Sequence, residues 1–152
     1  MKKVRGFEVV KGWKEKDIHF PIRKTKYSAG YDIEAAEDTV IPSFTLGSSP
    51  TLVATGLKAY MQEDEVLYLY NRSSNPKKKG LILANGVGVI DKDYYENEEN
   101  DGHIFFAFYN NRKEDIFIQK GEVIGQAVFS KFLVTDDDQA SGIRKGGFGS
   151  TN

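Results

Sequence analysis

Short runs of apolar and β-branched residues, separated by glycine, proline and asparagine turns, dominate the chain from Tyr31 onward. Runs of this length and composition predict β-strands rather than helices. The strands predicted in this way are 39–41, 51–58, 66–70, 81–84, 104–109, 116–118 and 127–133. Many short strands joined by turns predict an all-β fold, as a sandwich, jelly roll or barrel, in one domain without internal repeats.

Three segments refine this prediction. Residues 104–108 are continuously apolar, which is typical of a strand buried on both faces. The acidic and polar residues 94–102 lie between two apolar strands, so we expect them to form the tip of a hairpin that reaches into solvent. The apolar pattern ends at Asp136, which predicts a packed domain over 1–135 and a flexible glycine-rich arm over 136–152.

Composition excludes several classes of protein. With 152 residues, 39% hydrophobic and 28% charged, the chain has the make-up of a globular domain. A net charge of −1 argues against a direct nucleic-acid partner, and no apolar run is long enough to cross a membrane. The basic N-terminus has no apolar stretch behind it, so it does not resemble a secretory signal. The absence of cysteine excludes disulfides and thiolate metal sites, and we expect a cytoplasmic location.

Five polar clusters do not fit a hydrophobic core. They are Ala-Gly-Tyr-Asp at 29–32, Asn-Arg-Ser-Ser at 71–74, Asn-Gly-Val-Gly-Val-Ile-Asp-Lys-Asp-Tyr at 85–94, Gly-Glu-Val-Ile-Gly-Gln at 121–126 and Gly-Gly-Phe-Gly-Ser-Thr at 146–151. In order and approximate spacing they resemble the five motifs of the homotrimeric dUTP pyrophosphatases (dUTPases), over nearly the whole chain. The resemblance implies a jelly-roll-like dUTPase fold and a homotrimer with shared active sites. It also implies Mg²⁺ on the triphosphate and hydrolysis of dUTP to dUMP and pyrophosphate.

The resemblance assigns three residues to the chemistry. Asp91 would orient and deprotonate the water that attacks the α-phosphorus in line, which requires a rigidly placed carboxylate. Arg72 would offer charged fork donors to the phosphates, and Gln126 would donate to an α-phosphate oxygen. From the residues alone, capping a turn is the commoner role for an aspartate such as Asp91, and Gln126 could be a satisfied polar residue of the core.

A second group would hold the nucleoside. The Asn85 amide can donate and accept together, so it could pair with one edge of uracil, and the extended backbone at Gly88, Val89 and Ile90 would complete the recognition. Tyr94 would stack on the deoxyribose and leave no room for a 2′-hydroxyl. The alternative for Tyr94 is a half-exposed aromatic residue on a strand.

The remaining assignments concern the phosphates and the metal. Ser73 and Ser74 would bind phosphate oxygens beside the arginine of the same motif. Asp32 would hold a water of the Mg²⁺ shell, or pair with a basic group across the subunit interface. Because Mg²⁺ keeps several waters and binds mainly through the substrate's phosphates, no cage of carboxylates is expected.

The arm would close the site. Phe148, supplied by a neighbouring subunit's arm, would stack on uracil, while the γ-phosphate would meet Arg144, Gly149, Ser150 and Thr151. Lys145 could share the role of Arg144, because Arg144 lies one residue closer to Phe148 than in the usual spacing of the family. A frayed terminus is the ordinary alternative for a glycine-rich end.

Other functions fit the sequence less well. A dCTP deaminase, which resembles dUTPases in fold, needs a glutamate on the strand after the hairpin, and 104–109 carries no carboxylate. Two histidines and no cysteine cannot build the zinc site of a nucleoside deaminase, and no P-loop is present. A binding protein remains as the alternative from another class. In it, nucleotide would act as a switch and the acidic segment Glu96 to Asp101 would recruit a protein partner.

Overall fold

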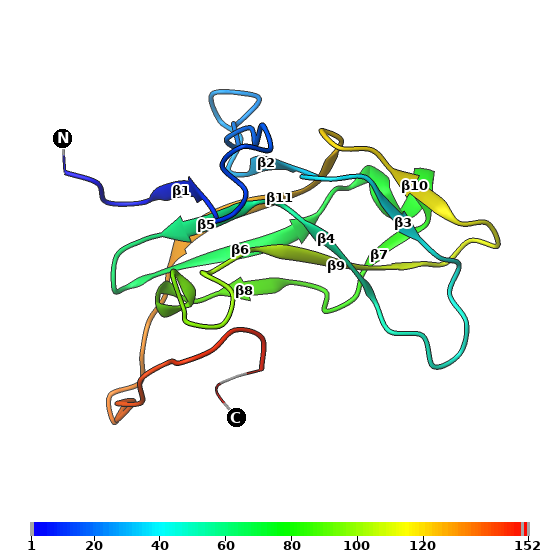
Figure 1. Cartoon of the computed structure of the whole chain (residues 1–152). Helices are drawn as coiled ribbons and strands as arrows, with labels where there is room; N and C mark the ends of the chain where they lie inside the picture. Colours follow the sequence, from blue (N-terminus) through cyan, green and yellow to red (C-terminus); the bar gives the residue numbers. More distant parts are fainter. Residues whose placement is uncertain (1, 150, 152) are drawn as a thin grey trace.

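The structure, a computed structural model, describes residues 2–149 and 151, and strands dominate it (Figure 1). The strands are β1 (Gly6–Val9), β2 (Tyr31–Glu34), β3 (Thr39–Ile41), β4 (Thr51–Ala54), β5 (Leu57–Tyr60), β6 (Glu65–Asn71), β7 (Leu81–Leu83), β8 (Gly88–Ile90), β9 (Phe105–Asn110), β10 (Ile116–Ile118) and β11 (Val123–Lys131). Two single helical turns interrupt them, η1 (Asn75–Lys79) and η2 (Lys92–Tyr94). No helix of the described residues is long and apolar enough to cross a membrane.

The strands pair antiparallel in two main sheets. One has the order β2-β11-β6-β8 and the other β4-β9-β7, while β1 pairs with β5 and β3 with β10. The longest pairing joins β11 to β6, from Gly125 opposite Asn71 to Lys131 opposite Glu65. Neighbours that are distant in sequence, such as β2 beside β11, are typical of a jelly-roll-like fold, and the all-β prediction is confirmed.

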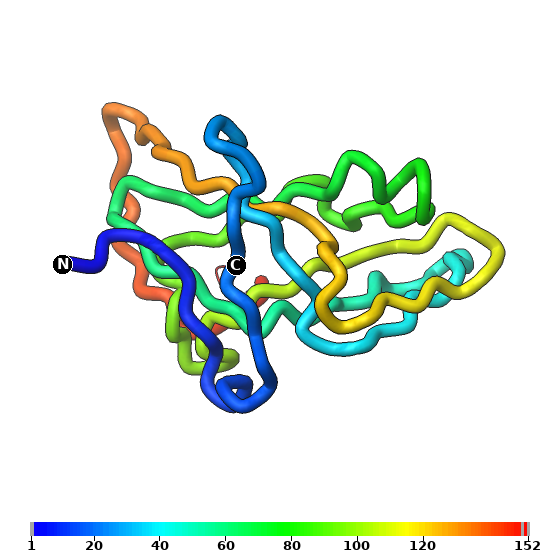
Figure 2. The backbone as a smooth tube through the Cα atoms, turned by 90° about the horizontal axis from the view of Figure 1, so that it is seen from above, coloured from blue at the N-terminus to red at the C-terminus, as the bar shows by residue number. Residues whose placement is uncertain are grey.

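The two main sheets pack face to face around a core of aromatic and aliphatic side chains. Phe106 and Phe108 of β9 are fully buried, and Leu67 of β6 joins them in the same cluster. Gly125 of β11 lies so close that a β-carbon there would sit 2.3 Å from the ring of Phe106. Seen from above, the N-terminal segment and the arm share one end of the molecule, and the β3–β4 and β9–β10 connections lie at the other (Figure 2).

Several strand predictions hold and others need correction. The ranges 39–41 and 116–118 match β3 and β10, whereas the predicted strand 51–58 is divided into β4 and β5. Gly56 makes the break, because its φ of +70° takes the backbone out of the extended region. The strands β1, β2 and β8 lie outside the predicted ranges, since glycine or acidic residues break the apolar pattern in each of them.

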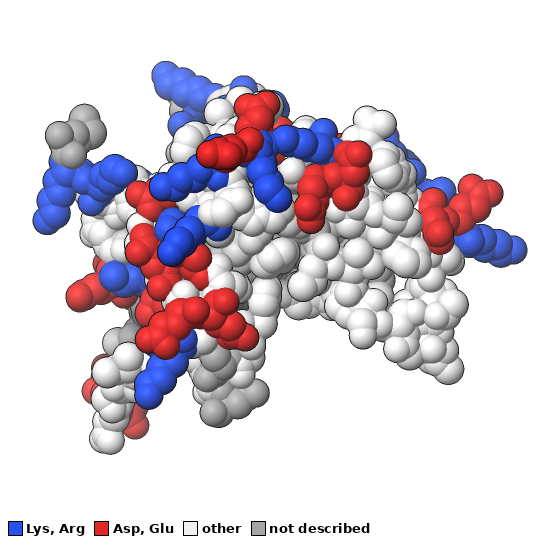
Figure 3. Space-filling view, viewed as in Figure 1, with Lys and Arg blue, Asp and Glu red and all other residues white. Residues whose placement is uncertain are grey.

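The expectation that 104–108 is buried on both faces is wrong for the single chain. Along β9 the burial alternates, so Phe106 and Phe108 are buried while Phe105, Ala107 and Tyr109 are half-buried. The outward face continues onto the neighbouring strands through residues such as Leu52, which is 49% exposed. A broad area over β4 and β9 carries no charged side chain (Figure 3). An apolar face of this kind is typical of a contact between subunits.

The expectation of a hairpin tip in solvent is also wrong, because residues 94–102 fold back onto the domain. Asn97 is buried, and its amide donates hydrogen bonds to the carbonyl of Tyr94 and to Asn100 Oδ1. Lys58 of β5 forms ion pairs with Glu96 at 3.2 Å and Asp101 at 3.0 Å. Polar side chains that satisfy one another make this acidic connection compact.

His103 anchors the base of the same segment. It is only 5% exposed, and its Nε2 accepts a hydrogen bond of 2.9 Å from the backbone N–H of Gly56. Burial lowers the pKa of His103 to about 4, against a smaller opposing effect of the charge on Asp101. The ring packs at 5.1 Å against Trp13, so the N-terminal segment and the hairpin meet here.

Candidate active site

The predicted phosphate residues gather at one end of the four-stranded sheet. On β11, Gln126 lies between Asp32 of β2 and Tyr70 of β6 in the register of the sheet. Because paired residues on neighbouring strands point to the same face, these three side chains form one row. A β-carbon on Gly30 would lie 2.1 Å from Gln126 Oε1, so this glycine makes room for the amide.

The arginine–serine motif continues from the same edge. Arg72 follows β6 directly, and its Nη1 donates to the carbonyl of Val123 at 3.3 Å. Ser73 is exposed, and Ser74 precedes η1 without capping it through its side chain. The next residue, Asn75, is buried and donates to the carbonyl of Ile124, which fixes the loop to β11. The loop therefore presents a guanidinium and a hydroxyl beside Gln126 from a rigid support.

The predicted nucleoside residues form a second group on β8 and the turn before it. Asn85 is exposed in a turn that Gly86 closes with a φ of +72°. Gly88 packs against Leu69, where a β-carbon would come within 2.9 Å of the leucine side chain. Val89 is 58% exposed and Ile90 is buried. The backbone of β8 is thus held close to β6, with one face open to a ligand.

Asp91 is the first residue after this strand. Its carbonyl accepts the N–H of Tyr94 at 3.1 Å, so the backbone begins the turn η2. The carboxylate caps no helical N–H and its side chain is 54% exposed. The turn-capping alternative therefore applies to the backbone of Asp91 and leaves the carboxylate for another role.

Tyr94 is buried, which corrects the alternative of a half-exposed strand residue, and it lies in η2. Its hydroxyl donates to the carbonyl of His103 at 2.6 Å and accepts from Asn100 Nδ2 at 2.8 Å. Burial raises the pKa of the Tyr94 hydroxyl, and the hydrogen bond from Asn100 acts in the opposite direction. The ring is consequently locked in one orientation beside Asp91.

The C-terminal arm passes beneath β8 and reaches this group (Figure 1). Arg144 contacts two carboxylates, with Nη2 at 2.7 Å from Asp91 and Nε at 2.8 Å from Asp93. Its side chain is 9% exposed, and the guanidinium lies 5.9 Å from the centre of the Tyr94 ring. The neighbouring Lys145 is exposed. Of the two basic residues, Arg144 is the one placed at Asp91 in the single chain.

The aromatic residue of the arm lies on the same surface. The ring of Phe148 is 6.1 Å from that of Tyr94 and 6.2 Å from that of Phe105, centre to centre. Gly149 has a φ of +68°, and Thr151 is exposed. Ser150 lies outside the described residues. The arm therefore brings Phe148 to the predicted nucleoside group of its own chain, and its closure on a neighbouring subunit stays a prediction.

The two groups do not meet within one chain. Ile90, the residue before Asp91, pairs with Leu67, whereas Arg72 follows the far end of β6. Five residues of extended chain separate Leu67 from Arg72, or about 17 Å. Asp91 and Arg72 therefore stand at backbone positions near opposite ends of β6 in the single chain.

Comparison with known proteins decides the family. The sequence matches the model of the dUTPase family over residues 16–152. The chain belongs to the dUTPase family. A deoxyuridine 5'-triphosphate nucleotidohydrolase of Lactococcus lactis subsp. lactis (strain IL1403) is 57% identical over 151 residues, which is 98% of each chain. The enzyme of the same name from Shigella sonnei (strain Ss046) is 32% identical over 140 residues, covering 88% of this chain and 87% of its own.

Solved dUTPase structures agree with the fold. The crystal structure of dUTPase from Streptococcus mutans matches 86% of this chain and 98% of its own, with 48% identity and a TM-score of 0.79. A dUTPase of the Staphylococcus aureus phage phi11, in a mutant form described with a structural Mg(II) ion, is 19% identical. It covers 92% of this chain and 98% of its own at a TM-score of 0.71, which supports the fold alone.

Sequence motifs did not reveal every residue of this dUTPase site. Asp93, Glu99 and Asn100 contact the arm or Tyr94 but were not predicted. Asp93 could have been predicted, because it is a second aspartate two positions after Asp91. Glu99 and Asn100 carry no such signal, since only the folded hairpin brings them to the arm.

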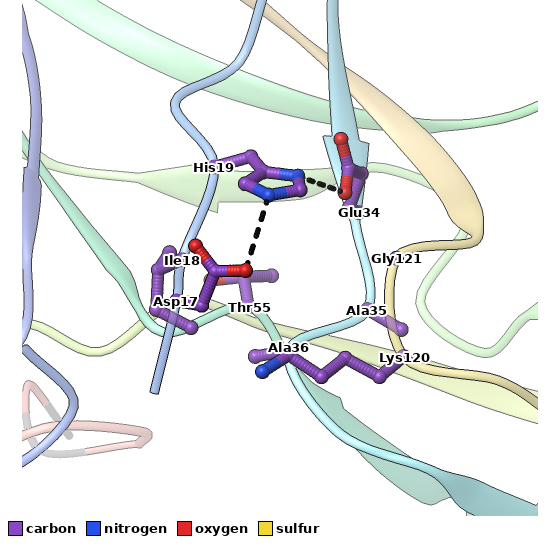
Figure 4. Close-up of a pocket in the computed structure, with 9 residues that line it drawn as sticks. All are labelled: Asp17, Ile18, His19, Glu34, Ala35, Ala36, Thr55, Lys120 and Gly121. Carbon is purple, nitrogen blue, oxygen red and sulfur yellow. Dashed lines mark hydrogen bonds and ion pairs between the residues drawn. The ribbon is translucent and has the colours of Figure 1, made fainter. Parts of the chain in front are cut away.

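A pocket of about 300 Å³ lies apart from these residues, between the segment before β2 and the loop before β11 (Figure 4). His19 points toward Glu34, with Nδ1 at 3.0 Å, and lies 3.6 Å from Asp17. None of the described site residues predicted from sequence lines this pocket. Over residues 2–149 and 151, no group of three His, Cys, Asp or Glu side chains is arranged to hold a metal ion.

Proposed function

We propose that this chain hydrolyses dUTP to dUMP and pyrophosphate in a homotrimer whose sites are shared between subunits. The observation that carries the proposal is the division of the dUTPase motifs between the two ends of β6. Asp91 and Tyr94 lie at one end, and Arg72 and Gln126 at the other. Each group presents polar side chains on a rigid sheet, and two copies are needed to surround one nucleotide.

Assembly is supported by the surface of the single chain. The half-buried outer face of β9 is apolar, and the uncharged area over β4 and β9 extends it (Figure 3). Burying such a face between identical subunits removes apolar area from water, and closed rotational symmetry repeats the contact around the axis.

The chemistry proceeds through positioning. Asp91 orients a water in line with the α-phosphorus and accepts its proton as the oxygen–phosphorus bond forms. The bond between the α-phosphorus and the bridging oxygen then breaks, and pyrophosphate leaves. Arg72 and Gln126 of a neighbouring subunit donate to the phosphate oxygens, on which negative charge develops.

Nucleoside selection follows from the second group. Asn85, on an exposed turn, would pair with an edge of uracil, and Tyr94, held by its hydroxyl, would face the deoxyribose. A ribose hydroxyl would meet the fixed ring, which excludes UTP. Phe148 would cover the base, and Arg144 would exchange its carboxylate partners for the γ-phosphate as the arm closes.

Mg²⁺ would bind at the phosphate end of the site, bound to the triphosphate of the substrate. Asp32 is partly exposed, stands beside Gln126 in the register and has Lys24 Nζ at 3.9 Å, so its carboxylate can accept a water of the metal shell. When bound, the ion would neutralise charge on the triphosphate.

Pyrophosphate release tests the proposal. It should be measured with dUTP, dCTP, dTTP and UTP in the presence of Mg²⁺, for the wild type, for Asp91→Asn, and for Asp136→Asn as a control in the exposed segment after β11. We expect turnover of dUTP alone, a loss of about 10³-fold in kcat for Asp91→Asn, and no change for the control. Well-folded wild type without dUTP turnover would refute the proposal.

Mixing variants tests the shared site. Asp91→Asn and Arg72→Ala are each expected to be inactive, because each removes one end of every site. Co-refolded mixtures should recover activity, since a site with Asp91 from one subunit and Arg72 from another arises in about a quarter of random combinations. Mixtures as inactive as their components would exclude sharing between subunits.

A further inference from the structure

We propose that the acidic hairpin 96–101 is the seat of the C-terminal arm, and that Glu99 is a positioning residue which holds Gly147 so that Phe148 reaches Tyr94. The inference rests on the proposed function, because the arm is taken to close over the nucleotide. It gives the acidic segment an occupant from this chain in place of a foreign protein.

The hairpin is built as a rigid platform. Glu96 and Asp101 adopt positive φ values of 54° and 60°, a conformation uncommon outside glycine. Both carboxylates pair with Lys58, whose side chain is 11% exposed. Burial acts to lower the pKa of Lys58, but its bonds to the two carboxylates outweigh this and raise it. Two unfavourable backbone conformations are therefore retained by contacts with the domain.

Glycine completes this platform at its base. Gly102 has a φ of +81°, and a β-carbon there would lie 2.8 Å from the backbone nitrogen of Glu96 and 2.9 Å from the carbonyl of Tyr94. The first and last residues of the hairpin are in direct contact, because the N–H of Glu96 donates to the carbonyl of Asp101 at 3.2 Å. This contact fixes the direction of the side chains between them.

Glu99 and Asn100 are the hairpin residues that face the arm. Glu99 Oε2 accepts a hydrogen bond from the backbone N–H of Gly147. Gly147 is buried, and a β-carbon on it would lie 3.0 Å from Asn100 Nδ2 and 3.2 Å from Glu99 Oε2. The seat therefore accepts a glycine closely and leaves little space for a side chain.

The same two hairpin residues connect the arm to Tyr94. Asn100 Nδ2 donates to the tyrosine hydroxyl, so the side chain beside Gly147 also orients the ring that Phe148 contacts. Fixing Gly147 leaves Phe148, the next residue, within a short reach of this ring. A seat that forms before the nucleotide binds reduces the ordering cost of closure.

Other acidic side chains of the hairpin do not offer this contact. Glu96 and Asp101 are engaged by Lys58, and Glu98 forms no hydrogen bond or ion pair with the described residues of the arm. Glu98 therefore provides a matched control, because Glu98→Ala removes the same charge one residue away. Glu99→Gln provides the conservative variant, since it keeps an oxygen that can accept from Gly147.

Limited proteolysis of the full chain without nucleotide tests the seat. Trypsin cleaves after Arg144 and after Lys145, and the release of residues 145–152 and 146–152 can be followed by mass spectrometry. Cleavage proceeds from the unseated arm, so loss of a hydrogen bond to a charged acceptor should accelerate it about tenfold in Glu99→Ala. Glu98→Ala should match the wild type, and Glu99→Gln should recover most of the protection.

Kinetics test the link to turnover. For dUTP hydrolysis, Glu99→Ala should lower kcat/KM about tenfold, mainly through KM, while Glu99→Gln stays within about threefold of the wild type. Unchanged cleavage in Glu99→Ala, or faster cleavage with unchanged kcat/KM, would overturn the inference. Wild type that protects its arm through Glu99 but does not hydrolyse dUTP would refute the proposed function and with it the positioning role.

Discussion

Protonation of His103 should destabilise the fold in mild acid. Its Nε2 accepts the N–H of Gly56, so the folded protein holds the neutral ring with its proton on Nδ1. Adding a proton at Nε2 removes that acceptor and places a charge where the side chain is 5% exposed. Burial accordingly lowers the pKa of His103 to about 4.

The size of the effect follows from the two pKa values. An unfolded histidine titrates at its ordinary pKa of 6.5. Because the folded pKa is lower, the contribution to stability is complete well above pH 6.5 and declines as the pH falls toward 4. The free energy of unfolding should therefore drop by about 1.4 kcal/mol at about pH 5.5, and by about 2.6 kcal/mol at about pH 4.5.

The chain carries its own reporter for this measurement. Trp13, its single tryptophan, packs at 5.1 Å against His103. Urea unfolding followed by tryptophan fluorescence, at one chain concentration and at about pH 7.5, 5.5 and 4.5, gives the free energies directly. The comparison is between the wild type and His103→Gln, whose amide oxygen can accept the N–H of Gly56 without titrating. His19→Gln, at the other histidine, serves as the control.

The difference between the variants isolates His103 from the carboxylates that also titrate in acid. We expect His103→Gln to lose about 2.6 kcal/mol less than the wild type between about pH 7.5 and 4.5. Equal losses in the two proteins would show that His103 does not carry the pH dependence, and the reasoning from its burial would be refuted.

Three further predictions concern packing, the arm and specificity. Gly125→Ala should lower the free energy of unfolding by about 3 kcal/mol in urea titration, since its β-carbon would lie 2.3 Å from the ring of Phe106; a loss below about 1 kcal/mol would contradict this packing. Gly147→Ala should raise KM for dUTP several-fold, whereas Gly142→Ala, with no atom within 4 Å of its β-carbon, should not. Equal effects of the two substitutions would show that the close contact of Gly147 with Glu99 and Asn100 does not affect substrate binding. Tyr94→Ala should raise the ratio of UTP to dUTP turnover in parallel assays, and an unchanged ratio would exclude the ring from sugar selection.

The sequence predicted the elements whose pattern is local. Strands such as β3 and β10 follow from a few β-branched residues between turns, and their bounds agree. The break at Gly56 did not show in the pattern, because apolar residues continue on both sides and only the positive φ separates β4 from β5. The acidic hairpin was misjudged for the opposite reason, since its polar side chains are satisfied by partners distant in sequence such as Lys58.

The candidate site likewise contains some residues that a local motif predicts and others that only the fold brings together. Asp91 and Tyr94 were found through their motif, and the structure places them together in one turn. The contact between Glu99 and Gly147 joins residues 48 positions apart and depends on the fold of the hairpin. No spacing rule could have predicted it.

If Asp91 and Arg72, which lie at opposite ends of β6, serve one site from two subunits as proposed, catalysis would depend on chain concentration. With shared sites, an isolated subunit holds a full set of motifs and no complete centre, so activity appears only above the dissociation constant of the assembly. Specific activity should then fall on dilution, because total activity depends on chain concentration more steeply than first order. Nucleotide that bridges two subunits should delay that fall by mass action.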